Sequence, residues 1–263
     1  MNPDTAGTRR PVVVAGDLHG DLQWARHLIR SARAAGARTI LQVGDLGVLW
    51  PGRAKGRFDA RLDAYLEAFD MNLGFVDGNH DNHTELRLLD VEADGLARVR
   101  PRILYLPRGG RTVVEGLTVG GLGGAFSVDY EWRTPDKSWW PGIEEVEAGD
   151  IEKLIAGGPV DVLLTHDVPA SVPMRGELDL PAEIQTRAQV SRDLLQNAVE
   201  ALKPPLLFSG HWHTRLKHTI HHPDGTATQV EVLNMNGSKA GNAVLIHPGP
   251  PVQIEPLIVG TAG

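Results

Sequence analysis

The sequence of 263 residues contains no cysteine. This absence excludes disulfides, zinc–thiolate sites, iron–sulfur clusters and cysteine nucleophiles, so any reactive site must use oxygen and imidazole groups. Long apolar runs are also missing, because no stretch approaches the ~20 consecutive apolar residues of a membrane span. The apolar run at residues 12–15 is too short for the hydrophobic part of a signal peptide, and we therefore expect a cytoplasmic protein.

Basic residues are in the minority, with 26 Lys and Arg against 33 Asp and Glu, which gives a net charge of −7. The chain as a whole therefore does not attract nucleic acid or an anionic membrane, and any phosphate-bearing partner must be attracted locally. The 41% hydrophobic and 22% charged residues are ordinary for a soluble globular protein. Because no repeat, low-complexity segment or linker divides the chain, we expect residues 1–263 to form a single domain.

Short apolar runs alternate with helical patterns in the first third of the chain. The patterns predict strands over 11–16, 39–43 and 73–76, and helices over 22–35 and 58–71. This alternation favours an α/β fold with a mostly parallel sheet. Ligands usually bind at the carboxyl ends of the strands in such a sheet.

The pattern changes after residue 91. Residues 102–106, 111–114 and 117–120 are typical of short strands joined by glycine-containing turns, which predicts antiparallel hairpins. Helices are then expected over 146–156 and 191–202, and strands over 160–164, 206–208, 216–220, 226–233 and 243–246. Two irregular stretches, 123–142 and 168–183, are long for a compact domain, and loops of this length are often functional.

Metal-ligand residues gather in the loops that follow predicted strands. Five of the eleven histidines are there: His19, His80, His166, His211 and His213. The strand-end loops also supply the oxygen ligands Asp17, Asp45 and Asn79. A lone histidine after a strand is more often structural, but imidazole with carboxylate and carboxamide oxygens suits manganese, iron, nickel or zinc.

The number of these residues favours two metals over one. The candidate ligands are Asp17, His19, Asp45, Asn79, His166, His211 and His213. One metal rarely needs seven ligands, whereas two metals ~3.5–4 Å apart that share a carboxylate would use them all. Asp45 is the best candidate for the shared ligand, because it is central in the order.

The same residues fall into five blocks that resemble the motifs of the calcineurin-like metallophosphoesterases. In order, the blocks are Gly16-Asp17-Leu18-His19, Gly44-Asp45-Leu46-Gly47, Gly78-Asn79-His80-Asp81, Thr165-His166 and Gly210-His211-Trp212-His213. The resemblance implies a metallophosphoesterase fold, a four-layer αββα sandwich of two mixed β-sheets flanked by helices. It places two divalent metal ions at the carboxyl edge of the strands.

The resemblance also implies a role for each residue. Asp17, His19, Asp45 and His213 would hold the first metal, and Asp45, Asn79, His166 and His211 the second. Manganese is the expected metal, with iron, nickel or zinc as alternatives. His80 would stand near the leaving group as a general acid or as a stabiliser of charge. Asp81 would orient the ring of His80 or, alternatively, cap a helix that begins near residue 82.

These features predict a phosphoric ester hydrolase in which a metal-bound hydroxide attacks phosphorus. We expect a phosphodiesterase that acts on a nucleotide or a nucleic-acid end. A phosphomonoesterase is the nearest alternative, and a scaffold without catalysis is a third. Ser/Thr protein phosphatases extend the second block with an Asp-Arg pair, whereas this sequence continues as Gly47-Val48-Leu49, which argues against that activity.

The segment 125–141 holds three of the six tryptophans. Arg133 is a candidate phosphate clamp, and Trp139 or Trp140 a candidate for stacking on a base or sugar. The alternative for the two tryptophans is a hydrophobic plug that anchors the loop. A basic stretch around Arg98, Arg100 and Arg102 is interpreted as the solvated face of a strand, with a nucleic-acid groove as its alternative.

Overall fold

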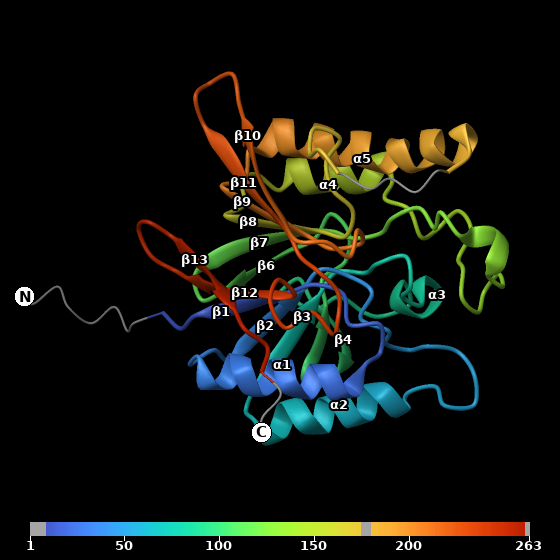
Figure 1. Ribbon diagram of the computed structural model, residues 1–263, viewed down its shortest axis with the longest axis vertical. Coiled ribbons are helices and arrows are strands. Elements are labelled where there is room, and N and C mark those ends of the chain that lie inside the picture. The colour runs from blue at the N-terminus through green and yellow to red at the C-terminus, as the bar shows by residue number, and fades with distance from the viewer. Residues whose placement is uncertain (1–8, 175–179, 261–263) are drawn as a thin grey trace, which may run out of the picture.

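The computed structural model describes residues 9–174 and 180–260, in which two β-sheets pack face to face between layers of helices (Figure 1). The first sheet has the order β13-β12-β1-β2-β3-β5-β4. Its strands are β1 (Val12–Ala15), β2 (Thr39–Gln42), β3 (Asn72–Phe75), β4 (Ala97–Arg100), β5 (Ile103–Tyr105), β12 (Ala243–His247) and β13 (Gln253–Leu257).

The second sheet has the order β10-β11-β9-β8-β7-β6. Its strands are β6 (Arg111–Val114), β7 (Leu117–Leu122), β8 (Val162–Thr165), β9 (Leu206–Ser209), β10 (Leu216–His221) and β11 (Ala227–Val232). The helices are α1 (Leu22–Ala34), α2 (Arg57–Ala68), the short α3 (His83–Leu86), α4 (Ala148–Ala156) and α5 (Ala182–Leu202), together with the 3₁₀ helix η1 (Tyr130–Trp132).

Strand β1 shows why the chain forms layers. Its four residues are fully buried, and their side chains alternate between the two faces of the sheet. Val13 and Ala15 pack in the cluster that α1 and α2 cover, whereas Val12 and Val14 pack against the second sheet. A third cluster joins the outer face of the second sheet to α4 and α5. The predicted four-layer arrangement of two mixed sheets is therefore confirmed.

Parallel pairing brings the strand ends together at one edge of the molecule. Strands β1, β2 and β3 are parallel neighbours, and so are β7, β8 and β9. The loops that follow β1, β2, β3, β8 and β9 consequently meet at this edge, on the right of Figure 1. None of the helices that the structure describes is long and apolar enough to cross a lipid bilayer.

One predicted hairpin is wrong. The sequence pattern pairs residues 102–106 with 111–114 through a glycine turn, but β5 pairs parallel with β3 and antiparallel with β4. Strand β6 belongs to the other sheet, where it forms the expected hairpin with β7. Gly109 and Gly110 therefore lie where the chain crosses between the sheets.

Arg98 forms ion pairs with Glu92 and Asp94, as a solvated strand face would.

Helix α5 begins nine residues earlier than the pattern predicts. Its buried residues start at Ser191, because only that part packs on the second sheet. The preceding turns extend past the sheet edge (Figure 1), so they carry no apolar stripe that the sequence could reveal. This extension reaches the edge where the candidate ligands meet.

Candidate metal centre

The loops after five strands bring the candidate ligands together. Asp17 and His19 follow β1, Asp45 follows β2, Asn79 follows β3, His166 follows β8, and His211 and His213 follow β9. Oxygen and nitrogen atoms from these loops form two overlapping groups, Asp17 with His19 and His213, and Asp17 with Asp45 and His166. Within each group the ligand atoms lie within 4.8 Å of one another.

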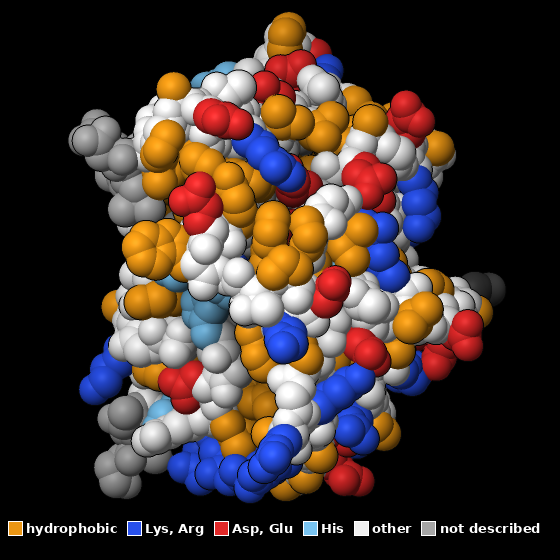
Figure 2. Space-filling model, turned by 90° about the vertical axis from the view of Figure 1, so that its right-hand side faces the viewer, with side chains coloured by type: hydrophobic (Ala, Val, Ile, Leu, Met, Phe, Trp, Pro, Cys, Tyr) orange, Lys and Arg blue, Asp and Glu red, His pale blue; other side chains and the backbone are white. Residues whose placement is uncertain are grey.

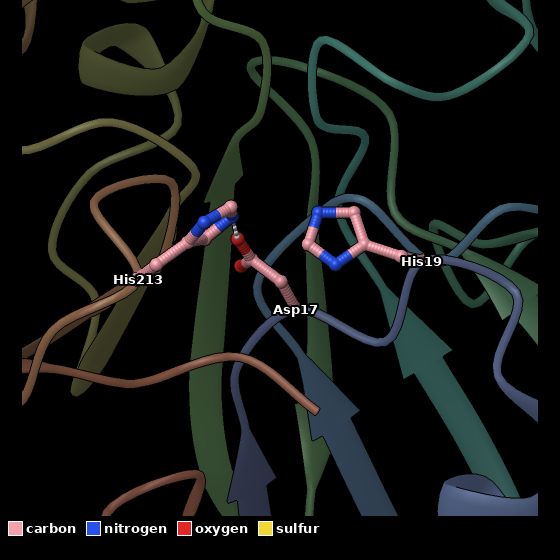
Figure 3. A group of neighbouring side chains, drawn as sticks. All are labelled: Asp17, His19 and His213. Carbon is pink, nitrogen blue, oxygen red and sulfur yellow. Dashed lines mark ion pairs between the residues drawn. The ribbon is translucent and has the colours of Figure 1, made fainter. Parts of the chain in front are cut away.

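The first group is open to solvent on one side. Figure 3 shows His19 and His213 on either side of the Asp17 carboxylate, with the Nε2 atom of His213 3.1 Å from Oδ2 of Asp17. Nε2 of His19 also lies 3.4 Å from Oδ2 of Asp45. The Nδ1 atom of His19 is occupied by the side-chain oxygen of Asn236 at 3.1 Å, which leaves Nε2 as its free ligand atom.

The second group is buried around His166. Its Nδ1 atom is 2.8 Å from the backbone oxygen of Val43, so Nδ1 carries the proton and Nε2 is the metal-binding atom. Nε2 lies 3.0 Å from Oδ1 of Asn79 and 3.5 Å from Oδ1 of Asp45. Because Nδ1 is already bonded, either a proton on Nε2 or a metal cation bound there satisfies the two oxygens that converge on it. This donor set fits a divalent metal.

Asp17 belongs to both groups, and Asp45, a member of the second group, also contacts His19 of the first. Its Oδ2 atom faces His19 and its Oδ1 atom faces His166, which suits a ligand shared by two metals. His211 approaches less directly. Its backbone N–H contacts both carboxylate oxygens of Asp17 at 3.2–3.3 Å, and its ring lies 5.0 Å from the ring of His166.

The acidic cluster perturbs the histidines beside it. Burial lowers the pKa of His166, but the charge and hydrogen bond of Asp45 outweigh it and raise that pKa to about 10. For His19, burial is outweighed in the same way by Asp45, and the pKa rises to about 9. Burial alone would raise the pKa of Asp45, yet His166 holds it well below its ordinary value. The cluster therefore attracts positive charge.

The backbone of the ligand loops is shaped for close approach. His19, Asp45, His211 and His213 have φ angles of 45°, 57°, 65° and 48°, in the left-handed region that residues with a side chain rarely adopt. Glycines make room beside them, since a Cβ atom on Gly78 would overlap Asp45 and one on Gly210 would overlap Asp17. The motif glycines thus serve the placement of the carboxylates.

A second layer of residues supports the ligands. The Asn79 amide nitrogen donates to the hydroxyl of Ser127 at 3.2 Å, and that hydroxyl donates to Glu144 at 2.9 Å. Glu144 is buried, and burial raises its pKa to about 7 against the opposing effect of its hydrogen bonds from Ser127. No motif in the sequence points to Asn236, Ser127 or Glu144, because they come from distant segments.

Asp81 has a different environment from either sequence alternative. Its buried carboxylate accepts hydrogen bonds from the backbone N–H groups of Gly47, Gly78 and Leu46 at 2.8, 2.9 and 3.3 Å. The cap of α3 is Asn82, whose side chain accepts from Glu85. Asp81 therefore ties the Asp45 loop to the Asn79 loop, and these hydrogen bonds involve backbone rather than the ring of His80.

His80 is in contact with Arg133, the candidate phosphate clamp. The Nη1 atom of Arg133 lies 3.1 Å from Nδ1 of His80, and Nη2 lies against Nε2. Asp129 pairs with the same guanidinium at 2.6 Å. Burial lowers the pKa of His80 to about 4, with Asp45 opposing this effect and Arg133 reinforcing it.

The two neighbouring tryptophans do not reach the candidate ligands. Trp140 is 1% exposed and packs edge-on against Trp50 and His83. Trp139 packs on Tyr130 and donates to Glu144 at 3.2 Å. The structure therefore favours the alternative in which these residues anchor the segment, because their rings are taken up by internal contacts.

Two cavities flank the candidate ligands. The α5 cavity, of about 670 Å³, lies among Arg133, Trp212 and the N-terminal turns of α5. The α2 cavity, of about 520 Å³, lies among Trp50, Phe58, Arg57 and Arg61. His80 lines both. The sequence could have indicated that Trp212 lies near the site, because it stands between the candidate ligands His211 and His213. The approach of α2 to the site becomes visible only in the fold.

This fold and this arrangement of ligand loops define a phosphoesterase of the calcineurin-like type. The model of that family, calcineurin-like phosphoesterase, matches residues 10–215. The chain therefore belongs to the calcineurin-like phosphoesterase family.

Two curated proteins are similar to part of this chain. The lariat debranching enzyme of Homo sapiens is 29% identical over 162 residues, which cover 56% of this chain and 29% of that protein. The lariat debranching enzyme of Schizosaccharomyces pombe is 26% identical over 56% of this chain and 34% of its own length. This chain spans about a third of the length of these relatives.

The fold is also similar to that of the protein TT1561 of Thermus thermophilus, with a TM-score of 0.59 and 16% identity. That match covers 96% of this chain and all of the other.

Proposed function

We propose that the protein is a metal-dependent phosphodiesterase that acts on a nucleotide or nucleic-acid phosphate ester. One observation carries this proposal: the candidate ligands lie at the junction of two cavities, and His80 lines both. A phosphodiester has a substituent on each side of phosphorus, whereas a monoester has only one. Cavities of about 520 and 670 Å³ have the size of small-molecule sites, so each has room for one substituent.

The ligand set supports a centre of two divalent cations. Asp17, His19 and His213 would hold one, Asn79, His166 and His211 the other, and Asp45 would lie between them. Such a pair, for which manganese is our candidate, neutralises phosphoryl oxygens and lowers the pKa of water. The protein's own task is to hold these seven side chains in place through Asp81, Asn236 and the Ser127–Glu144 pair.

His80 and Arg133 are our candidates for the groups that act on the substrate. Arg133 carries a planar cation that matches phosphate oxygens, and it lines the α5 cavity. His80 lies beside Asp45, with Nε2 4.0 Å from Oδ2, and is open to both cavities. Because burial lowers the pKa of His80 to about 4, its imidazole is neutral near pH 7, and its ring N–H is able to stabilise negative charge on the leaving oxygen through a hydrogen bond. Displacement of Arg133 onto the phosphate would free the ring for this role.

The relatives support a nucleic-acid substrate. Two curated relatives are lariat debranching enzymes, at 29% and 26% identity over 56% of this chain. A lariat RNA therefore belongs among the test substrates, beside linear oligonucleotides and small diesters.

The decisive experiment combines metal content with hydrolysis. The purified protein, loaded with manganese, is expected to bind close to two metal ions per chain and to hydrolyse bis(p-nitrophenyl) phosphate faster than p-nitrophenyl phosphate. The Asp45→Asn variant is expected to lose metal and turnover together. A faster rate with the monoester would favour a phosphomonoesterase. The absence of turnover with any substrate in a protein that binds two metals would contradict the proposal.

A further inference from the structure

The α2 cavity differs in charge from the α5 cavity. None of the described residues that line the α2 cavity is acidic, and its lining includes Arg57 and Arg61. The α5 cavity, by contrast, is lined by Asp129 and Asp167 as well as by its arginines. The face at the strand ends shows Lys and Arg side chains gathered along its lower edge, on the side of α1 and α2 (Figure 2). This local charge is opposite to the net charge of −7.

Arg57 and Arg61 are exposed and available to a ligand. They lie four residues apart on α2, so their side chains are neighbours on one face of the helix. In the ranges 9–174 and 180–260, no ion pair joins either of them to a carboxylate, whereas nearby Lys55 is neutralised by Glu85 at 2.9 Å. Two adjacent unpaired guanidinium groups are suited to a phosphate.

The side chain of Trp50 lines the same cavity as these two arginines. Trp50 is 37% exposed, and its ring rests edge-on against buried Trp140 at 5.7 Å. The backbone next to it is fixed, because the N–H of Leu49 donates to Asp59 and the oxygen of Leu49 accepts from Asn82 at 2.8 Å. An indole that is held in place and open to a cavity is suited to stacking on a base.

From these contacts we infer that the α2 cavity binds the nucleotide next to the scissile phosphate, with its base against Trp50 and its far phosphate on Arg57 and Arg61. The substrate class is then a single-stranded oligonucleotide with at least two phosphates rather than a small diester. This inference rests on the proposed diesterase function. A phosphorylated peptide would use the arginines but has no base for Trp50.

The test measures binding and hydrolysis separately. Binding of fluorescein-labelled oligothymidylate is measured by anisotropy with the Asp45→Asn protein, with and without Arg57→Ala/Arg61→Ala. Because this protein is expected to lack metal, the measurement reports the contacts that its side chains make. The double change is expected to weaken binding about tenfold, because contacts between charged groups are lost. It is also expected to make the slope of log Kd against log salt shallower by about 0.7 for the one phosphate.

Hydrolysis is measured with the protein that keeps Asp45, and it compares the two substrates. The double arginine change is expected to raise KM for oligothymidylate about ten times more than KM for bis(p-nitrophenyl) phosphate. Arg30→Ala is the matched control, because Arg30 lies on α1 about 12 Å from Leu22 at the cavity edge. Trp50→Leu is expected to weaken oligonucleotide binding by about 5- to 100-fold.

The outcomes separate this inference from the proposed function. Equal oligonucleotide binding by the double arginine variant and the Arg30→Ala control would overturn the inference while leaving small-diester hydrolysis as evidence for the function. A phosphopeptide hydrolysed in preference to oligothymidylate, with the same arginine dependence, would overturn it as well. If no diester were hydrolysed, the function would fail, but a tenfold loss of binding in the Asp45→Asn background would still support the cavity assignment.

Discussion

The carboxylate of Asp81 accepts a hydrogen bond from the backbone N–H of Gly47 at 2.8 Å. Because Gly47 follows Asp45 and Asp81 follows Asn79, this bond fixes the distance between two loops that carry candidate ligands. The carboxylate also accepts from Gly78 within its own loop at 2.9 Å. Asp81, for which the sequence predicted a role in orienting His80 or in capping a helix, thus supports the loops that carry Asp45 and Asn79.

The Asp81→Ala substitution is expected to destabilise the protein and weaken metal binding. Two buried N–H groups and one half-buried N–H group would lose their acceptor, at a cost of about 3 kcal/mol in the free energy of unfolding. Loss of such outer support lowers metal affinity by about 10- to 100-fold. Denaturant unfolding and manganese titration measure the two effects.

Asn82→Ala is the control for Asp81, because it removes the neighbouring cap of α3 and a hydrogen bond to the Leu49 oxygen, which together are expected to cost about 2 kcal/mol while metal affinity is kept. Metal affinity that stays at the wild-type value in Asp81→Ala, with kcat abolished, would instead support a role in orienting His80.

The stability of the metal-free protein is expected to depend on pH through Glu144. Its pKa is raised from 4.5 to about 7 in the fold, so the neutral form stabilises the folded state. That contribution is fully present below pH 4.5 and is lost as pH rises through about 7. Glu144→Gln removes the titration and keeps a side-chain oxygen that accepts a hydrogen bond from Ser127.

Urea unfolding at several pH values tests the Glu144 prediction. Relative to Glu144→Gln, the wild type is expected to lose about 3 kcal/mol between pH 4.5 and 7. Other carboxylates titrate equally in both proteins, so the difference isolates this one group. Parallel curves for the two proteins would contradict the prediction.

The Asn236→Ala substitution is expected to weaken one metal site selectively. Asn236 contacts Nδ1 of His19 at 3.1 Å and donates to Asp21 at 3.1 Å, so its loss frees the His19 ring to rotate. Affinity for the metal on the His19 side is expected to fall by about 10- to 100-fold, while the His166 side retains its metal. Equilibrium dialysis against manganese resolves the two sites.

Asn234→Ala is the matched control for Asn236. Among residues 9–174 and 180–260, the Asn234 side chain makes one hydrogen bond, which it accepts from the N–H of Met235 at 2.8 Å. An equal loss of both metals in Asn236→Ala would indicate a collapse of the cluster rather than the release of one ring.

The Arg133→Lys substitution is expected to reduce kcat/KM for a diester although it preserves the charge. A lysine cannot reproduce the planar contact with both nitrogens of His80 or with two phosphate oxygens. We expect a loss of about 10-fold or more, measured with bis(p-nitrophenyl) phosphate at saturating manganese. Arg187→Lys, in an exposed pair with Glu145 at 2.8 Å, serves as the control. Equal rates for the two variants would exclude a substrate contact by Arg133.

Local patterns were sufficient for β1, β2, β3 and β12 of the first sheet and for the position of the ligand loops, whereas β13 was not predicted. A strand with both faces covered and a helix with one buried face leave different patterns of apolar residues. The apolar run at 12–15 therefore predicts only a strand, and the spacing at 22–34 only a helix. The candidate ligands could be placed because each directly follows such a strand. The two-sheet architecture, in contrast, came from the family resemblance.

Other features depend on tertiary context that a local pattern does not contain. Ile103–Tyr105 and Arg111–Val114 look like the arms of a hairpin, but a glycine turn and a crossing between sheets have the same local sequence. Trp140 is an apolar residue in a loop that is otherwise largely polar, and the sequence allows it either to anchor the loop or to stack on a substrate. Its packing on His83 and Trp50 decides for the anchor. Arg57 is an ordinary surface residue until the fold brings α2 beside His80.

The left-handed backbone at His19, Asp45, His211 and His213 would couple the free energy of metal binding to the conformational order of the ligand loops. Each such residue costs about 1–2 kcal/mol compared with an ordinary backbone conformation. A bound cation would hold these turns closed against that tension. Its removal would let them relax, and amide hydrogens at the strand ends would exchange faster while those within β1 and β9 stayed protected. Part of the free energy of metal binding would therefore be used to keep these loops in their strained conformation.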